Sequence, residues 1–297
     1  LDAGREYPRL AWEGSGGEII PAPHLTWLPG QGTAEDPYRI DTANQLILLN
    51  RASVLWDKHL TLDADVDLDP NLPNGQVLPR AVIPDFTGIF EGGGHIISHL
   101  MITGESRLGL FGRLEGEIKD LGVVDVNITG SGSYVGGLVG KSGGTVTQCY
   151  STGAVSGRYY VGGLVGYNGG RVAQCYSMGT ISGDGGVGGL VGSNDEGRVT
   201  FCYSTATVTG GDYGIGGLVG SNLEGRVSFC YSTGSVTNPY GGLVGVGEEY
   251  RVFASFWDTQ SSGSAWSGGG TGKTTGEMQT AKTFLDAGWD FVGETAN

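Results

Sequence analysis

One pentapeptide, Gly-Gly-Leu-Val-Gly, occurs five times in this chain at nearly constant spacing, with steps of 26, 26, 28 and 25 residues between copies. The copies begin at Gly136, Gly162, Gly188, Gly216 and Gly241. Each of the first four is followed by Val-x-x-Cys-Tyr-Ser and then by a short Val or Ile segment. A unit this small cannot bury its apolar face alone, so the repeat requires neighbouring units to stack.

Each unit contains short apolar pieces separated by Gly, Ser, Asn or Asp, and none of them has helical spacing. Stacking equivalent strands gives parallel sheets with coils about 4.8 Å apart. We therefore predict an all-β fold, a parallel β-helix, and expect it to be right-handed because parallel crossovers follow that rule. A β-propeller blade needs about 40 residues. The prediction requires one continuous file of Leu138, Leu164, Leu190 and Leu218.

The chain divides into four predicted regions. A short helix over 41–50, with Asp41 as N-cap, is expected to cover the first coil, and a second helix is expected to run from the capping box Thr274–Glu277 to Asp286. The regions are an N-terminal segment that resembles the end of a preceding module (1–35), a cap helix with the first coils (36–107), the repeats (108–260), and a C-terminal loop with a cap helix (261–297).

A tetrapeptide at the start of the chain returns near its end. Leu1-Asp-Ala-Gly4 recurs as Leu285-Asp-Ala-Gly288. Two explanations stay open: the chain is a piece of a tandem array, or its first segment completes a neighbouring subunit head-to-tail.

Composition limits the partners. The formal net charge is −14, which disfavours nucleic acid and anionic lipid as partners, and no apolar run is long enough for membrane insertion. Glycine contributes 58 residues while 38% of the chain is hydrophobic, so we expect a folded protein with many tight turns. Cations, neutral glycans and other proteins remain candidate partners.

The repeated Gly-Gly-Leu-Val-Gly followed by Cys-Tyr-Ser-Thr-Gly resembles the GLUG-motif repeats of bacterial secreted and surface proteins, over roughly residues 108–260. The region from Phe86 to Ser98 is similar to the first coil of such proteins, although Glu91-Gly-Gly-Gly-His95 replaces the more usual Asp-Gly-Asn-Gly-His. The resemblance implies an extracellular or cell-surface location and adhesion-type roles. It implies no shared catalytic residues.

Stacking converts repeated side chains into rows. The four cysteines are expected to form one row, either as buried free thiols or with one or two disulfides. A row of tyrosines is expected on the opposite side of that strand. It either forms a platform on which sugar rings or a partner protein stack, or consists of rings that pack only on one another. A second aromatic row precedes the pentapeptide, with Tyr213 and Tyr240 nearby. The candidate ligand-binding residues are Tyr150, Tyr176, Tyr203, Tyr231, Tyr134 and Tyr160.

Two groups of acidic residues are candidates for metal binding or for catalysis. Four aspartates alternate with apolar residues, and on one strand they would share a face that is either a solvated acidic surface or a Ca²⁺ site. They are Asp63, Asp65, Asp67 and Asp69. A glycoside hydrolase would need two carboxylates about 5–10 Å apart, and the candidates are Asp85, Glu91, Asp120 and Asp125. A polysaccharide lyase is less favoured because Lys and Arg total only 17.

The sequence thus predicts an extracellular structural or adhesive repeat module. We expect it to bind a protein or a glycan along its side, or to assemble head-to-tail, without a cofactor unless Ca²⁺ is bound. A carbohydrate-active β-helix enzyme is the alternative.

Overall fold

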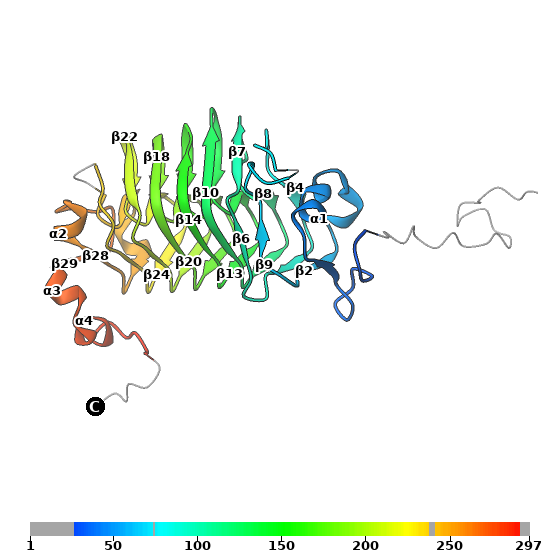
Figure 1. The fold of residues 1–297 in the computed structure, drawn as a ribbon. Coiled ribbons are helices and arrows are strands. Elements are labelled where there is room, and N and C mark those ends of the chain that lie inside the picture. The colour runs from blue at the N-terminus through cyan, green and yellow to red at the C-terminus, as the bar shows by residue number, and fades with distance from the viewer. Residues whose placement is uncertain (1–26, 74, 238–240, 292–297) are drawn as a thin grey trace, which may run out of the picture.

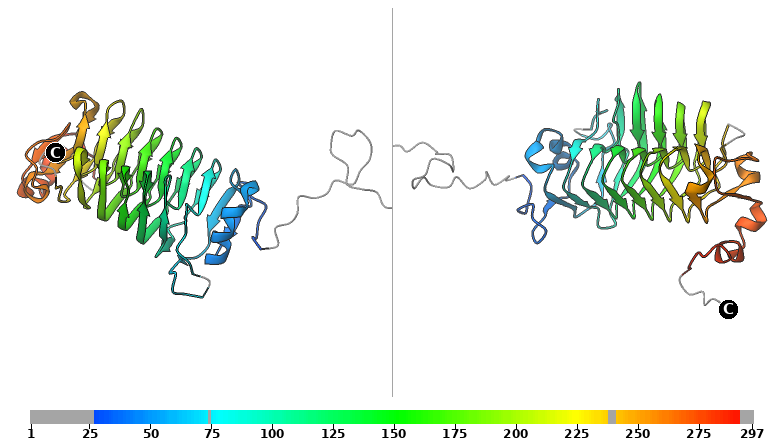
Figure 2. Two further views of the ribbon diagram at one scale, coloured as in Figure 1. Left: turned by 90° about the horizontal axis from the view of Figure 1, so that it is seen from above. Right: turned by 180° about the vertical axis from the view of Figure 1, so that it is seen from behind.

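The computed structural model describes residues 27–73, 75–237 and 241–291. The strands wind into an elongated β-helix (Figure 1), as the repeat spacing predicted, and further views show the coils following one another along a single axis (Figure 2). Three parallel sheets run along this axis, here called sheets A, B and C. Equivalent residues of successive repeats are paired in register within each of them.

Sheet A contains nine strands in the order β1, β2, β5, β9, β13, β17, β20, β24 and β27. Their bounds are Tyr38–Ile40, His59–Leu62, Ile89–Glu91, Glu117–Lys119, Thr145–Thr147, Arg171–Ala173, Arg198–Thr200, Arg226–Ser228 and Val252–Phe253. Sheet C contains seven strands in the order β4, β8, β12, β16, β19, β23 and β26. Their bounds are Ile83–Phe86, Phe111–Leu114, Val139–Ser142, Val165–Asn168, Val191–Asn194, Val219–Asn222 and Val244–Gly247.

Sheet B is the longest and has an irregular edge. Its main path is β3 (Val66–Asp67), β6 (Ile96–Ser98), β10 (Gly122–Gly130), β14 (Tyr150–Ser156), β18 (Tyr176–Gly188), β21 (Tyr203–Ser204), β25 (Tyr231–Ser232), β28 (Phe256–Asp258) and β29 (Thr271–Lys273). Four further strands pair beside this path: β7 (Met101–Gly104), β11 (Ser133–Gly136), β15 (Tyr159–Gly162) and β22 (Thr207–Gly216).

The predicted leucine file is present and lies in the core. The backbone N–H of Leu138 donates to the carbonyl of Leu164 at 3.0 Å, and Leu164 donates to Leu190 in the same way. Leu190 donates to Leu218 at 2.9 Å. All four side chains are fully buried. The periodicity of the sequence is therefore a row of like side chains along the axis.

The second glycine of the pentapeptide is required by close approach of neighbouring coils. A Cβ atom on Gly163 would lie 2.2 Å from the carbonyl oxygen of Gly189, and one on Gly189 would lie 2.1 Å from that of Gly217. No side chain fits at these distances, so glycine at this position allows successive coils to hydrogen-bond through the corner.

The four cysteines are buried free thiols, which is the first of the two alternatives considered for them. The backbone N–H of Cys149 donates to Sγ of Cys175 at 3.4 Å, and the same contact recurs from Cys175 to Cys202 and from Cys202 to Cys230. At the next coil Ser255 takes the cysteine position, and its Oγ accepts from the N–H of Cys230 at 3.1 Å. In this row the cysteine sulfur and the serine hydroxyl oxygen thus both accept a hydrogen bond from the backbone N–H of the cysteine in the preceding coil.

A second buried row consists of asparagine side chains at the last residues of three successive strands of sheet C. Nδ2 of Asn168 donates to Oδ1 of Asn194 at 2.7 Å, and Nδ2 of Asn194 donates to Oδ1 of Asn222 at 2.7 Å. The three side chains are fully buried. Among the described residues, Nδ2 of Asn222 and Oγ of Ser142, at the two ends of this row, have no hydrogen-bond partner.

Short helices lie at both ends of the β-helix (Figure 1). At the N-terminal end α1 spans Ala43–Leu48 and is followed by the 3-10 helices η1 (Leu49–Arg51) and η2 (Ser53–Leu55). The prediction of Asp41 as N-cap was wrong by one residue. Thr42 is the cap, because its hydroxyl and the Gln45 side chain form a reciprocal capping box.

The C-terminal end carries α2 (Thr259–Ser262), α3 (Thr275–Met278) and α4 (Ala281–Leu285), after the 3-10 helix η3 (Glu249–Arg251). The capping box between Thr274 and Glu277 is confirmed. The predicted continuous helix to Asp286 is wrong, because the chain leaves the helix at Gln279 and starts a new one at Ala281. The recurrent segment Leu1–Gly4 lies outside the described residues.

Candidate functional site

The first tyrosine row stacks along sheet B with its ring faces covered. The centroids of Tyr150, Tyr176, Tyr203 and Tyr231 follow one another at 4.7, 4.9 and 5.0 Å, with interplanar angles of 5° or less. At one end the Tyr150 ring lies against the backbone of Gly122, and at the other Tyr231 contacts Phe284 and Trp289. Only ring edges remain for a ligand, which is the mutual packing considered from the sequence.

The second tyrosine row is different because it stops after two rings. Tyr134 and Tyr160 stack at 5.4 Å and 17°. Tyr167 from β16 lies edge-on to both, at 5.8 and 6.3 Å. The ammonium of Lys141 lies over the rings of Tyr134 and Tyr167 at 5.7 and 5.1 Å, which closes this cluster on the side of the preceding coil.

The backbone conformation in this row favours glycine, yet two coils have tyrosine there. Tyr134 and Tyr160 have φ values of 66° and 56°, and the equivalent Gly186 and Gly214 have 62° and 65°. A bulky residue in the left-handed region costs on the order of 1 kcal/mol. Two coils carry this cost at a position where the next two coils have glycine.

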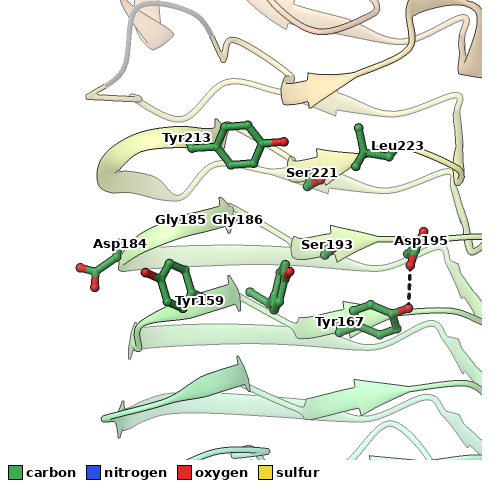
Figure 3. A pocket seen from close by; sticks show the side chains of 11 residues that line it. Tyr159, Tyr167, Asp184, Gly185, Gly186, Ser193, Asp195, Tyr213, Ser221 and Leu223 are labelled. Atoms are coloured by element: carbon green, nitrogen blue, oxygen red, sulfur yellow. Dashed lines mark hydrogen bonds between the residues drawn. The ribbon is translucent and has the colours of Figure 1, made fainter.

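The break in the aromatic rows leaves a gap one coil wide. Tyr159 pairs in register with Gly185, and Gly185 pairs with Tyr213 on the following coil. Tyr159 and Tyr213 are therefore two coil rises apart, about 9.6 Å, with no side chain at the rung between them. Figure 3 shows the Tyr159 side chain extending toward the end of the gap at Asp184 and the Tyr213 side chain extending toward the opposite end.

This gap opens into a pocket of about 540 Å³, which we call the tyrosine slot. Figure 3 shows Tyr159 and Tyr213 on either side of the strand that carries Gly185 and Gly186. The lining residues are Tyr159, Tyr160, Tyr167, Asp184, Gly185, Gly186, Ser193, Asp195, Tyr213, Ser221 and Leu223. The phenol rings provide apolar walls and the two serines provide hydroxyl groups.

The electrostatics of the tyrosine slot are neutral to negative. Its lining contains Asp184 and Asp195, and Asp184 forms a 3.6 Å ion pair with Arg158, whose guanidinium lies over the Tyr159 ring at 5.2 Å. The hydroxyl of Tyr167 donates to Oδ2 of Asp195 at 2.9 Å. Burial and this hydrogen bond raise the pKa of Tyr167 to about 12, so the phenol stays protonated and holds the carboxylate in place.

Glycine at position 186 leaves room for the ring of Tyr160 on the preceding coil. A Cβ atom on Gly186 would lie 2.9 Å from Cδ1 of Tyr160. At Gly185 a Cβ would lie 3.3 Å from the carbonyl oxygen of Tyr213 and 3.5 Å from Cδ1 of Tyr159. Gly186 thus permits the ring position, whereas Gly185 leaves the rung empty.

The acidic candidates for hydrolysis are distributed over different sheets. Asp85 lies on β4 of sheet C, opposite Arg113 of the next coil. Glu91 ends β5 of sheet A and forms a 2.7 Å ion pair with Lys119. Asp120 follows β9, and Asp125 lies within β10. None of the four lines the tyrosine slot.

The prediction that four aspartates share one strand face is wrong. The chain bends between β2 of sheet A and β3 of sheet B, and each carboxylate has a local partner. The partners are Arg39 for Asp63 (3.8 Å), His95 for Asp65 (3.0 Å), His99 for Asp67 (2.8 Å) and the backbone of Asn71 for Asp69 (2.8 Å). Within the described ranges no group of three or more His, Cys, Asp or Glu side chains is arranged to hold a metal ion.

The sequence reasoning missed most of the slot. It named Tyr213 only as a neighbour of the second row, and the structure places this residue in the row of Tyr159 instead. Tyr159, Tyr167, Asp184 and Asp195 were not singled out. The available signal was the substitution of Tyr159-Tyr160 in one repeat by Gly185-Gly186 in the next. Tyr240 lies outside the described residues.

Comparison with known proteins gives one family, one relative and one fold neighbour. The GLUG motif matches residues 131–156, 157–182, 183–209 and 211–237. Halomucin from Haloquadratum walsbyi is 33% identical over 141 residues, which cover 43% of this chain and 2% of Halomucin.

The fold neighbour is a candidate immunoglobulin A1 protease from Bacteroides ovatus, solved as a crystal structure. It superposes with a TM-score of 0.63 and 21% identity, over 86% of this chain and 89% of the other. At this identity the likeness concerns the fold. No helix in the described parts has the length and apolar character needed to cross a bilayer.

The family match covers the coils that carry both tyrosine rows and the tyrosine slot. Within residues 131–237, four consecutive segments thus match the GLUG motif, and they are wound into a parallel β-helix.

Proposed function

We propose that this chain is an extracellular repeat scaffold that binds a neutral glycan, without cleaving it, through the tyrosine slot on its side. The observation that carries the proposal is the empty rung between Tyr159 and Tyr213. A pyranose ring packs against a phenol face because its C–H bonds carry partial positive charge toward the negative ring face. Aromatic walls with a few placed polar groups are typical of small-ligand sites.

The polar groups support a hydroxyl-rich, uncharged ligand. Ser193 and Ser221 on sheet C offer hydroxyls, and Asp195 offers a carboxylate oxygen beside the bond from Tyr167. Asp184 is paired with Arg158 at 3.6 Å, so the carboxylate that disfavours an acidic sugar in the slot is Asp195. The extracellular location is supported by the GLUG repeats, which resemble those of secreted and surface proteins.

Filling the empty rung separates ligand binding from folding. In Gly185→Tyr the new side chain would occupy the empty rung, although its Cβ atom would lie 3.3 Å from the carbonyl oxygen of Tyr213, which is tighter than an ordinary contact. We expect this variant to fold and to lose glycan binding. Urea denaturation checks that the variant is folded.

The binding measurement is isothermal titration calorimetry with soluble neutral oligosaccharides from glucan, mannan, xylan, galactan and chitin. Tyr159→Ala and Tyr213→Ala should each weaken binding at least tenfold, because each removes one phenol ring that lines the slot. Tyr250→Ala, at an exposed position outside the slot, is the control and should bind normally. Unchanged binding in Gly185→Tyr, or no binding to any neutral oligosaccharide by the wild type, would refute the proposal.

The hydrolase alternative is tested in the same experiment. The two carboxylates that line the slot, Asp184 and Asp195, come from its opposite ends (Figure 3). Chromatography of each oligosaccharide after prolonged incubation detects cleavage products. Products that disappear in Asp184→Asn or in Asp195→Asn would replace the binding proposal by an enzymatic one.

A further inference from the structure

We propose a second binding site, for a carboxylated or sulfated polysaccharide, along an arginine row on the outer face of sheet A. The row consists of Arg171, Arg198 and Arg226, which begin β17, β20 and β24 and pair in register. All three side chains are exposed, and no ion pair or hydrogen bond of their side chains is present among the described residues.

Three like charges in register are unfavourable for the fold itself. Neighbouring guanidinium groups start from positions one coil apart, about 4.8 Å, and like charges directly opposite on paired strands destabilise a sheet. The same row position in earlier coils is occupied by Thr145 and Glu117. Sheet geometry therefore does not demand arginine there. A ligand with regularly spaced anionic groups would neutralise the row.

The positions beside the arginines complete a binding face. Ala173, Thr200 and Ser228 lie two residues after them on the same side of sheet A, and these side chains are small; Ala173 is buried, and Thr200 and Ser228 are half-buried. Beyond them, Phe201 and Phe229 stack at 5.1 Å and 13°, and Phe201 is 54% exposed. Both phenylalanines have positive φ values, 55° and 52°. Cationic groups, a low shelf and aromatic rings thus run in parallel along the axis.

Nearby charges set the strength of this site. Glu196 and Glu224 precede Arg198 and Arg226 by two residues and oppose an anionic ligand. The next equivalent position is Arg251, whose guanidinium donates to the carbonyl of Glu224 at 2.7 Å. The net charge of −14 acts mainly at a distance, and screening reduces it beyond about 8 Å at physiological salt. Contact with the three free guanidinium groups therefore decides binding.

The spacing favours a polysaccharide. One residue of an extended sugar chain is close in length to the rise of one coil, so anionic groups along it can face successive guanidinium groups. Arginine binds carboxylate and sulfate oxygens with two parallel hydrogen bonds. The sugar rings between those groups would lie over the shelf and against the phenyl rings.

The test uses the full chain and measures its affinity for polygalacturonate and for dextran sulfate at 50 mM and 300 mM NaCl. In R171Q/R198Q/R226Q we expect at least a tenfold loss of affinity at 50 mM NaCl and a weaker dependence on salt. The matched control R51Q/R80Q/R107Q removes three exposed arginines elsewhere, so it has the same net charge. It should bind as the wild type does.

The outcomes separate this site from its rivals. Equal loss in both triple variants would show that net charge alone controls binding and would overturn the proposal, as would absence of binding by the wild type. Tighter binding of a single-stranded DNA oligonucleotide than of both polysaccharides would overturn the ligand class. Neutral oligosaccharide binding at the tyrosine slot should persist in R171Q/R198Q/R226Q, so the two proposals fail independently.

Discussion

The buried amide row offers the sharpest test of how stacked coils stabilise one another. Asn194 is the middle member, and its side chain is bonded on both sides. Oδ1 accepts from Asn168 at 2.7 Å, and Nδ2 donates to Oδ1 of Asn222 at 2.7 Å and to the carbonyls of Gly197 and Arg226 at 3.2 and 3.3 Å. Asn222 is the last member and shares only one side-chain bond with the row.

The two positions should differ in a predictable way. Asn194→Ala removes two short bonds and leaves buried polar atoms on both neighbours, and each such atom costs about 1–3 kcal/mol, so we expect a loss of about 3–5 kcal/mol. Asn222→Ala removes one short bond together with an amide nitrogen that is already unsatisfied, so we expect about 1–2 kcal/mol. Asn194→Asp should be worse than Asn194→Ala, because it buries a charge and sets oxygen against oxygen.

Urea denaturation followed by far-UV circular dichroism measures these differences, provided that the variants share one m-value. Asn127→Ala, at an exposed position on β10, is the control and should change stability by less than about 0.5 kcal/mol. If Asn222→Ala were as destabilising as Asn194→Ala, the reasoning from satisfied and unsatisfied amides would be refuted.

Three further predictions concern the Asp67–His99 pair, the cysteine row and the first tyrosine row. The hydrogen bond between Asp67 and His99 lowers the pKa of the aspartate and raises that of the histidine, so its contribution is full between the unfolded values of about 3.8 and 6.5. It is lost as pH rises through the folded pKa of His99 or falls through that of Asp67, and the difference in melting temperature between wild type and His99→Gln should be largest near pH 5; a difference independent of pH would contradict this. The four cysteines should be inert to Ellman's reagent in the native protein and all reactive in denaturant, since burial protects each thiol; fast native labelling would show that the row is open. Tyr176→Ala should destabilise by about 2 kcal/mol, because its ring is stacked on both faces, at 4.7 and 4.9 Å; a loss no larger than that of the exposed Tyr250→Ala in the same denaturation assay would argue against stacking as its role.

The fold was predictable because a repeat converts local pattern into global geometry. The spacing of the pentapeptide predicts which leucines align, and the hydrogen bond from Leu138 to Leu164 follows from it. The prediction that the alternating aspartates lie on one strand was wrong. Alternation alone does not show where a coil turns, and the chain bends just after Leu62.

The tyrosine slot was harder to predict because it lies where two side chains of the repeat pattern are missing. Repeat comparison directs attention to what recurs, such as the row from Tyr150 to Tyr231, and those rings cover one another. The tyrosine slot exists where the pattern is interrupted, at Gly185 and Gly186. Whether a missing side chain leaves space depends on its neighbours in the two adjacent coils, and sequence spacing does not supply that information.

The longest repeat step, 28 residues instead of 26, shows where this architecture tolerates insertions. One extra residue lies in the turn between Asn194 and Arg198. The other lies between Gly210 and Tyr213, which pair with Gly183 and Gly185 of the preceding coil. Both turns border the slot, through Asp195 at one end and Tyr213 at the other. Length changes in these two turns leave the buried rows aligned, so new pockets can arise in one coil while the rest of the column keeps its stability.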